Sequence, residues 1–116
     1  MKQTLEKSLS QYVAAWNLLD AGEITAAFKQ CMSDDCTYTD KNTPTITGLQ
    51  QIVALVLSSH KSHPGRTFSL TSAPDYFNHV CRYYWRVNFI GAEGKDAMDY
   101  AEYGDDNKLT RIIGFL

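Results

Sequence analysis

Two aspartates in segments that alternate like β-strands are the residues of this sequence best suited to proton chemistry. Asp40 ends the stretch 34–40, in which Cys36, Tyr38 and Asp40 share one face of the expected strand. A carboxyl group that follows a thiol and an aromatic ring on an inward face is expected to be buried, and burial disfavours its charged form. Asp40 is therefore a candidate general base. A plainer interpretation is also open, because aspartate is common where a strand ends and a turn begins.

Asp99 is the second candidate, and two orientations are open for its side chain in the expected strand 95–103. Ala97, Asp99 and Ala101 share one face of that strand. If this face points inward, the small alanines leave room for a ligand beside the carboxyl group. Charged residues of the outer face then pair across the sheet, namely Asp96 and Glu102 with Arg82 and Arg86. In the other orientation Met98 and Tyr100 lie inside, and Asp99 is in water.

The elements expected to position these residues are three helices, one early strand and a series of later strands. The first helix covers residues 4–20, with Thr4 as its N-cap and an apolar stripe that includes Tyr12 and Trp16. The second helix covers 23–32, and the third begins at Gly48 and ends near His60. Strands are expected at 67–72, 80–90, 95–103 and 108–116, with a turn or bulge at 75–78 and a hairpin connection at 91–94.

This order of elements predicts an α+β fold, in which three N-terminal helices cover one face of a curved antiparallel sheet. The 116 residues correspond to one domain, 1–116, and a chain of this length buries a core without metal or disulfide support. A strongly bent sheet capped by helices encloses a cone-shaped hollow that suits a small molecule. The aromatic residues, which cluster in the strand segments, suit the lining of such a pocket.

Charge and cysteine content exclude several functional classes. The net charge is −2 and no block of like charge runs through the chain, which argues against nucleic acid as a partner. No apolar run reaches 18 residues and no signal-peptide pattern opens the chain, so we expect neither a membrane span nor secretion. The three cysteines have no metal-ligand spacing and predict reduced, buried thiols in a cytoplasmic protein: Cys31, Cys36 and Cys81.

His60 and His63 leave a further choice open, between ligands at the mouth of a pocket and simply solvated side chains. They lie in the expected loop 60–65, where Pro-Gly is a strong turn signal. No third metal ligand is spaced to join them. We therefore expect neither a metal nor a cofactor.

Segments along almost the whole chain follow one family pattern. They are the run Tyr12-Val13-Ala14-Ala15-Trp16-Asn17, the pair Ala27-Phe28, the run Asp34-Asp35-Cys36-Thr37-Tyr38-Thr39-Asp40, Gly48 with a following Ile52, and the end of the chain from Lys108 to Phe115. Together they resemble the nuclear transport factor 2-like superfamily and, within it, the SnoaL-like group and the bacterial ketosteroid isomerases. The resemblance implies the cone fold. It is a weaker guide to function, because this superfamily hosts isomerases, cyclases, dehydratases, epoxide hydrolases and non-enzymes.

The resemblance also implies roles for three residues. Tyr12 stands where the isomerases keep an oxyanion-hole tyrosine, and Asp40 stands where they keep the proton-shuttling base. Asp99 stands where they keep a protonated aspartic acid as the second oxyanion donor. Two departures accompany the match: Lys41 replaces a proline after Asp40, and the hairpin before Asp99 is one residue shorter.

Two functions from different classes follow from this interpretation. As an enzyme, the protein would transfer a proton next to a carbonyl group, with Asp40 as base and with Tyr12 and Asp99 as donors to the enolate. As a binding module, it would keep the pocket without the chemistry. In both cases we expect a small apolar carbonyl-containing ligand and a homodimer through the outer sheet face, which carries Tyr84 and Tyr100. The expected ligand-binding residues are Trp16, Phe28, Tyr38, Phe68, Tyr83 and Trp85.

The surroundings of the two aspartates predict different charge states. Asp99 lies between alanines and, in the inward orientation, faces the wall formed by Tyr83 and Trp85. Asp40 ends a strand beside Lys41 and a polar turn that water can reach. We therefore expect Asp99 to hold its proton near neutral pH and Asp40 to stay ionised.

Overall fold

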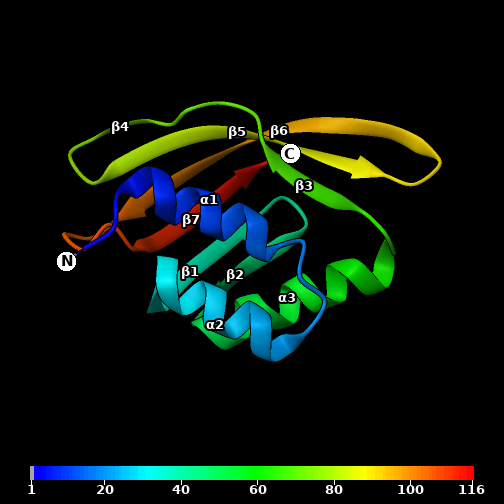
Figure 1. The fold of residues 1–116 in the computed structure, drawn as a ribbon, viewed down its shortest axis with the longest axis horizontal. Coiled ribbons are helices and arrows are strands. Elements are labelled where there is room, and N and C mark those ends of the chain that lie inside the picture. Colours follow the sequence, from blue (N-terminus) through cyan, green and yellow to red (C-terminus); the bar gives the residue numbers. More distant parts are fainter. Residues whose placement is uncertain (1) are drawn as a thin grey trace.

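The chain folds around a strongly curved sheet, and three helices pack against one side of it (Figure 1). A computed structural model describes residues 2–116. The helices are α1 (Leu5–Ala15), α2 (Ala21–Cys31) and α3 (Leu49–Ser62). Helix α1 packs against α2 and the sheet, and α3 packs against α2 and β1 (Met32–Asp40). The predicted α+β fold class is confirmed.

The N-terminal helix begins where the sequence predicts and ends earlier. The hydroxyl oxygen of Thr4 accepts a 3.2 Å hydrogen bond from the Lys7 amide, so Thr4 is the N-cap. The helix ends at Ala15 instead of residue 20. Asp20 is already the N-cap of the second helix, because its carboxylate accepts from the Glu23 amide at 3.0 Å.

The sheet has seven strands, and one pair of them is parallel. The remaining strands are β2 (Thr43–Thr47), β3 (Thr67–Leu70), β4 (Asp75–Phe77), β5 (Val80–Phe89), β6 (Ala92–Tyr103) and β7 (Leu109–Phe115). Their order is β2-β1-β7-β6-β5-β3, and β4 pairs with β5. Strands β1 and β7 run parallel, whereas the other neighbours are antiparallel. The sheet is therefore mixed, and the prediction of a wholly antiparallel sheet is wrong at this pair.

Two short strands, β2 and β4, are not among the strands that the sequence predicts. Strand β2 contains Pro44 and lies at the edge of the sheet, where a missing N–H is tolerated. Strand β4 covers residues predicted as a turn or bulge, and Asp75 pairs in register with Arg82. All three residues of β4 are exposed, so no alternation in the sequence marks it as a strand.

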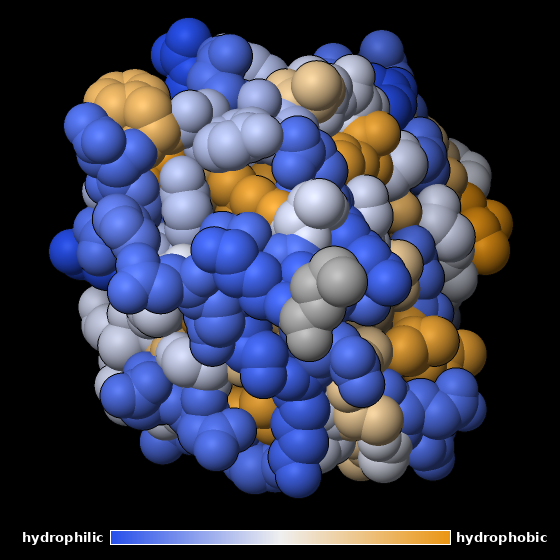
Figure 2. All heavy atoms as spheres, turned by 60° about the vertical axis from the view of Figure 1, so that its left-hand side comes forward, coloured by the Kyte–Doolittle hydropathy of each residue, from blue (hydrophilic) through white to orange (hydrophobic). Residues whose placement is uncertain are grey.

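The long strand β5 is two-faced, as its sequence predicts. Cys81, Tyr83 and Val87 are buried on the concave side, whereas Arg82 and Tyr84 are exposed. The three cysteines are unpaired and buried. No helix in residues 2–116 is long and apolar enough to cross a membrane. The end of the molecule that carries the N-terminus is largely hydrophilic, with hydrophobic atoms visible between the polar side chains and at the margins (Figure 2).

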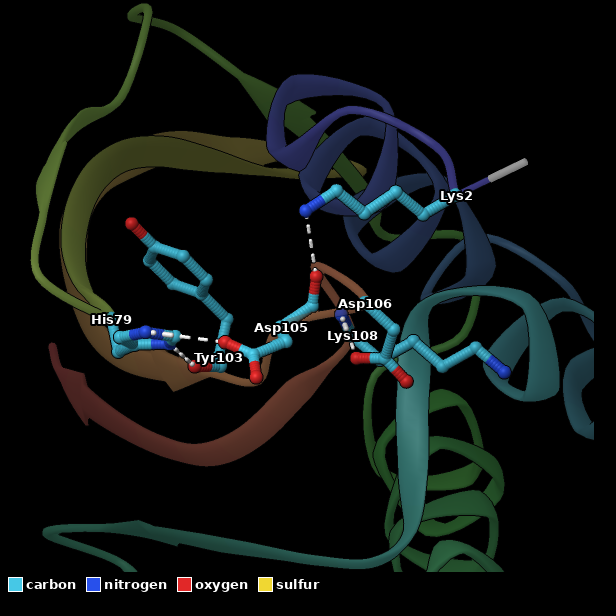
Figure 3. A network of polar contacts seen from close by, with 6 residues as sticks. All are labelled: Lys2, His79, Tyr103, Asp105, Asp106 and Lys108. Atoms are coloured by element: carbon cyan, nitrogen blue, oxygen red, sulfur yellow. Dashed lines mark hydrogen bonds and ion pairs between the residues drawn. The ribbon is translucent and has the colours of Figure 1, made fainter.

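Polar contacts tie the turns together at this same end (Figure 3). His79, in the β4–β5 turn, donates from Nδ1 to the carbonyl oxygen of Tyr103 at 2.9 Å. Lys2 donates from Nζ to the carbonyl oxygen of Asp105 at 2.8 Å. None of these residues lines the cavity described below, so the network is structural.

Candidate functional site

A cavity of ≈ 300 Å³ lies between α1, α3 and the concave face of the sheet. Its walls come from α1, α3, β1, β2 and the turn between them, β3 and the loop before it, β5, β6 and the C-terminus. Seven of the nine residues predicted for the site line it: Tyr12, Trp16, Tyr38, Asp40, Phe68, Trp85 and Asp99. Residues from five separate parts of the sequence therefore meet in one space.

The other two predicted residues, Phe28 and Tyr83, lie behind this lining. Both side chains are fully buried. The Phe28 ring stacks on Tyr12, with centroids 5.8 Å apart. Tyr83 donates from its hydroxyl to Oδ2 of Asp99 at 2.8 Å. Each therefore holds a cavity residue in place and has no direct access to a ligand.

Asp99 points into the concave side of the sheet and is 4% exposed. Its register partner on β5 is Tyr83, which shares the inward face. Oδ2 accepts from Tyr83, and Oδ1 accepts from Nε1 of Trp85 at 2.9 Å. Burial raises the pKa of Asp99 from 3.8 to about 6; the two donors oppose this change by stabilising the charged form, and the nearby Asp40 adds to it. The direction matches the prediction, but the carboxyl group still loses its proton just below neutral pH.

Asp40 is both a turn residue and a cavity residue, so both interpretations of its place in the sequence apply. It ends β1 and begins a turn, because its Oδ1 accepts a 2.8 Å hydrogen bond from the Asn42 amide. It also lines the cavity, where its Oδ2 accepts a 2.6 Å hydrogen bond from the Tyr38 hydroxyl. The side chain is only partly buried. A carboxylate that is held by two donors and still reached from the cavity suits a base.

Tyr12 presents a protonated hydroxyl to the site. The residue is 2% exposed, and burial followed by the charge of Asp99 raises its pKa well above 10. Its ring packs edge-on against Trp16, with centroids 6.5 Å apart. The hydroxyl therefore remains a hydrogen-bond donor throughout the physiological pH range.

The two aspartates and Tyr38 converge over Gly114 of β7. A Cβ atom at Gly114 would lie 3.4 Å from each of three atoms: Cβ of Asp40, Oδ1 of Asp99 and the hydroxyl oxygen of Tyr38. The missing side chain thus leaves space where β1 and β6 bring polar groups together across β7. Glycine inside a strand often marks a close approach of this kind, and that is the signal in the sequence that could have identified the position.

Two basic residues of the cavity wall were not predicted. Arg66, in the loop before β3, lines the cavity with its guanidinium carbon 5.1 Å from the centroid of the Phe68 ring. Lys95 also lines the cavity, and its register partner is Val87 on the inward face of β5. The sequence signal for Lys95 is its spacing, because it stands two and four residues before Ala97 and Asp99 on the same strand face.

The two histidines have separate roles. Nε2 of His60 lies 2.5 Å from the carbonyl oxygen of Trp16, so this nitrogen carries the proton and ties α3 to the end of α1. His63 is exposed and packs against the ring of Phe89, with centroids 5.8 Å apart. Within residues 2–116, no group of three His, Cys, Asp or Glu side chains is placed to hold a metal ion.

No family model and no curated protein matches this sequence. Among solved structures, the chain is similar to a proposed isomerase of the SnoaL-like family from Agrobacterium tumefaciens, with a TM-score of 0.86, 24% identity and 98% of each chain covered. It is also similar to a protein with a ketosteroid isomerase-like fold from Catenulispora acidiphila, solved in complex with trimethylamine, with a TM-score of 0.75, 14% identity and coverage of 97% of this chain and 87% of that one. A third is a nuclear transport factor 2-like protein of unknown function from an Exiguobacterium species, with a TM-score of 0.71, 15% identity and coverage of 93% and 96%.

At these identities the likeness concerns the fold. The three proteins carry the names of the superfamily and of the two groups that the sequence pattern resembles. Because each alignment covers nearly the whole chain, the likeness includes the helices as well as the curved sheet. The chain thus has the nuclear transport factor 2-like cone fold that SnoaL-like and ketosteroid isomerase-like proteins share.

Proposed function

We propose that this protein binds a small apolar carbonyl compound in the cavity and transfers a proton at the carbon next to the carbonyl group. One observation carries the proposal: a partly exposed carboxylate, a buried carboxyl group and a buried tyrosine hydroxyl line the same cavity. The three residues are Asp40, Asp99 and Tyr12. Enolate chemistry needs a base and donors of this kind within one enclosed space.

Asp40 is assigned the role of the base. It takes the α-proton, and the electron pair of the broken C–H bond moves onto the carbonyl oxygen as an enolate forms. Asp40 then returns the proton to the same or another carbon, so that the overall reaction is an isomerisation or a step of a cyclisation. The Tyr38 hydroxyl and the Asn42 amide keep the carboxylate oriented during both steps.

Tyr12 and protonated Asp99 are assigned as donors to the enolate oxygen. Donors aimed at a developing oxyanion contribute roughly 3–4 kcal/mol each in typical variant series. With a pKa of about 6, Asp99 is protonated in roughly one molecule in ten at pH 7. A developing negative charge beside it favours this protonated form, because two like charges in an apolar site repel each other.

The structural neighbours support the proposal at the level of analogy. The Agrobacterium protein is a proposed isomerase, and the Catenulispora protein has the ketosteroid isomerase-like fold. One fold hosts many functions, so the assignment depends on the side chains in this cavity. We expect the substrate to be smaller and less rigid than a steroid, because Trp16 and Trp85 both narrow the space.

The test is exchange of α-hydrogens for deuterium in enolisable aryl ketones, followed by NMR in heavy water. We expect the wild-type protein to accelerate the exchange and Asp40→Asn to lose about 100-fold to 10,000-fold of that acceleration, the usual contribution of a general base. Asp35→Asn is the matched control, since Asp35 lies on the same strand and is exposed. Exchange that is equal in wild type and Asp40→Asn contradicts the proposal.

A second candidate is a ligand-binding module without chemistry. It is favoured by the observation that both oxygens of Asp40 and both oxygens of Asp99 already accept hydrogen bonds from the protein. The carboxyl groups are thus satisfied without a reacting ligand. Ketone binding detected by NMR, with no exchange above background, distinguishes this candidate from the enzyme.

We keep the cytoplasm as the proposed location. The three thiols are buried and unpaired, and burial raises the pKa of each to about 12: Cys31, Cys36 and Cys81. Thiols of this kind are protonated and unreactive at neutral pH. They suit a reducing compartment, in which disulfides are rare.

A further inference from the structure

Arg66 is a cation in the cavity wall that forms no ion pair with any residue of the described range 2–116. Its side chain is partly buried and stacks on Phe68. The four ion pairs among residues 2–116 all use other basic side chains. Its Nε atom is buried and has no hydrogen-bond partner. Partial burial of an uncompensated charge is unfavourable, and an anion in the cavity would offset that cost.

Lys95 places a second cation at the same end of the cavity. Thr67, which follows Arg66, pairs with Asn88 near the end of β5, and Lys95 pairs with Val87 one residue away. Both cations therefore lie near the β5–β6 hairpin. Lys95 begins about 13 Å along the strand from Asp99, at 3.3–3.4 Å per residue. Lys95 thus lies toward the hairpin end of the cavity, and Asp99 lies further in.

Two further donors of the cavity wall are also without partners. Trp16 is 8% exposed, and its indole Nε1 lies near enough to the Tyr12 hydroxyl to oppose the rise of the Tyr12 pKa, but it has no partner at good hydrogen-bond geometry; the hydroxyl of Ser59 on α3 is also buried and unpaired. Both residues line the cavity together with Arg66. Buried donors almost always find an acceptor, so this side of the cavity lacks one. A carboxylate supplies acceptors and negative charge at once.

The geometry points to a ligand with two different ends. An enolisable carbonyl lies against Asp40, Asp99 and Tyr12, and a carboxylate group lies against Arg66, with Lys95 beside it. For the carbonyl end of the ligand, the inference rests on the proposed function. For the carboxylate end, it rests on the observation that Arg66 has no ion-pair partner. A guanidinium matches a carboxylate with two parallel hydrogen bonds, which gives orientation as well as affinity. The apolar middle of the ligand packs between the aromatic walls.

The experiment uses a homologous series of phenyl ketones that end in a carboxylate, with two to five methylene groups between the carbonyl and the carboxylate. Each is paired with its neutral primary amide, and dissociation constants are measured by NMR titration of the full-length protein. The wild type is expected to bind the best carboxylate about tenfold more tightly than its amide. Arg66→Gln should lose this preference, and Arg66→Lys should keep part of it. Arg82→Gln is the matched control, because it removes the same charge from the outer face, where Arg82 pairs with Asp75.

Four results would overturn the inference. They are equal binding of carboxylate and amide, no carboxylate binding at millimolar concentration to folded protein, a preference that survives in Arg66→Gln, and tighter binding of benzyltrimethylammonium than of any carboxylate. The last outcome would identify an aromatic and acidic site for cationic amines instead. Circular dichroism of each variant confirms that it is folded.

The same probes separate this inference from the proposed function. Asp40→Asn should lose the deuterium exchange but still bind the carboxylate more tightly than its amide, because removing a negative charge from the same cavity does not weaken anion binding. If the wild type prefers the carboxylate but does not accelerate deuterium exchange, proton transfer is refuted and the anion site is supported. Exchange without a carboxylate preference would refute the anion site alone.

Discussion

The hydroxyl of Tyr38 donates a 2.6 Å hydrogen bond to Oδ2 of Asp40, two residues further along the same strand. Residues two apart share a face in a strand, and the pairing of β1 with β2 shifts register between these two positions. Burial and the neighbouring carboxylate both raise the pKa of Tyr38 far above its usual value. Its hydroxyl is therefore always a donor to Asp40, and the two side chains form one unit in the cavity wall.

Removing this hydrogen bond should destabilise the folded protein, because the Asp40 carboxylate loses one of its two donors. Tyr38→Phe is expected to lower the free energy of unfolding by about 1–2 kcal/mol, since the bond joins a buried hydroxyl to a charged group. Urea denaturation of Tyr38→Phe, Asp40→Asn and the double variant gives the coupling between the two residues. The control is Tyr76→Phe, whose hydroxyl also donates to a carboxylate, that of Glu6 at 3.0 Å, but whose side chain is 47% exposed. Additive effects of the two substitutions would show that the pair is not coupled.

A methyl group at Gly114 should disturb the site more than the fold. The added Cβ would lie 3.4 Å from atoms of Asp40, Asp99 and Tyr38, which is the near edge of ordinary van der Waals contact. Gly114→Ala should therefore change the free energy of unfolding by no more than about 1 kcal/mol, because alanine also reduces the freedom of the unfolded chain. Deuterium exchange in aryl ketones should fall at least about tenfold, since the methyl group occupies space between the Asp40 and Asp99 side chains and a substrate misplaced by about 1 Å reacts much more slowly. Unchanged exchange by a folded variant would contradict the close approach.

Local patterns in the sequence predict much of this fold. The N-cap at Thr4 follows from residue type and position, and the two faces of β5 follow from strict alternation. The same kind of pattern gave a wrong end for α1. Trp16 continues the apolar stripe of the sequence, although the helix stops at Ala15. The stripe continues because the Trp16 side chain still packs inward, against Tyr38 and Phe68.

Features set by distant parts of the chain could not be predicted in this way. The parallel pairing of β1 with β7 joins segments more than 70 residues apart, and hairpin signals carry no information about it. Asp99 had two open orientations because both faces of its strand mix apolar and charged residues. Burial beside Tyr83 decides between them. The place of Arg66 in the cavity likewise depends on how β3 docks on β5.

We propose that two copies of the chain associate through the outer sheet face. Three strands place Tyr84, Met98 and Phe115 side by side there, in register across β5, β6 and β7. Tyr84 is 48% and Phe115 is 55% exposed. An aromatic centre flanked by ion pairs, such as Arg86 with Asp96, is typical of a protein interface.

Light scattering after size-exclusion chromatography tests this association. At micromolar concentration the expected mass is twice the 13.1 kDa of one chain. Phe115→Glu should yield the single-chain mass, because it places a charge at the centre of the row. Leu19→Glu is the control, since Leu19 is 72% exposed in the loop after α1, away from the sheet face. A wild-type mass of one chain would refute the dimer.

Asp99 should make stability depend on pH in a defined window. The native state keeps this proton up to about pH 6, whereas the unfolded chain releases it near 3.8. The contribution of Asp99 to stability is therefore fully present below about pH 3.8 and is lost as pH rises to about 6. At 1.36 kcal/mol per pKa unit, the loss is about 3 kcal/mol. Well above pH 6 both states have lost the proton, and the difference stays constant.

Asp99→Asn removes this titration while keeping the hydrogen bonds of the site. The amide carbonyl can accept from Trp85, whose indole only donates, and the amide nitrogen can donate to the Tyr83 hydroxyl. The free energy of unfolding of the variant, relative to wild type, should therefore rise by up to about 3 kcal/mol between pH 4 and pH 6 and then level off. Urea denaturation across this range measures it. Asp96→Asn is the control, because Asp96 lies on the same strand with its side chain 73% exposed. Parallel curves for wild type and Asp99→Asn would mean that the buried carboxyl group holds its proton no more tightly than the unfolded chain does, and the role of Asp99 as a donor to the enolate would then have to be abandoned.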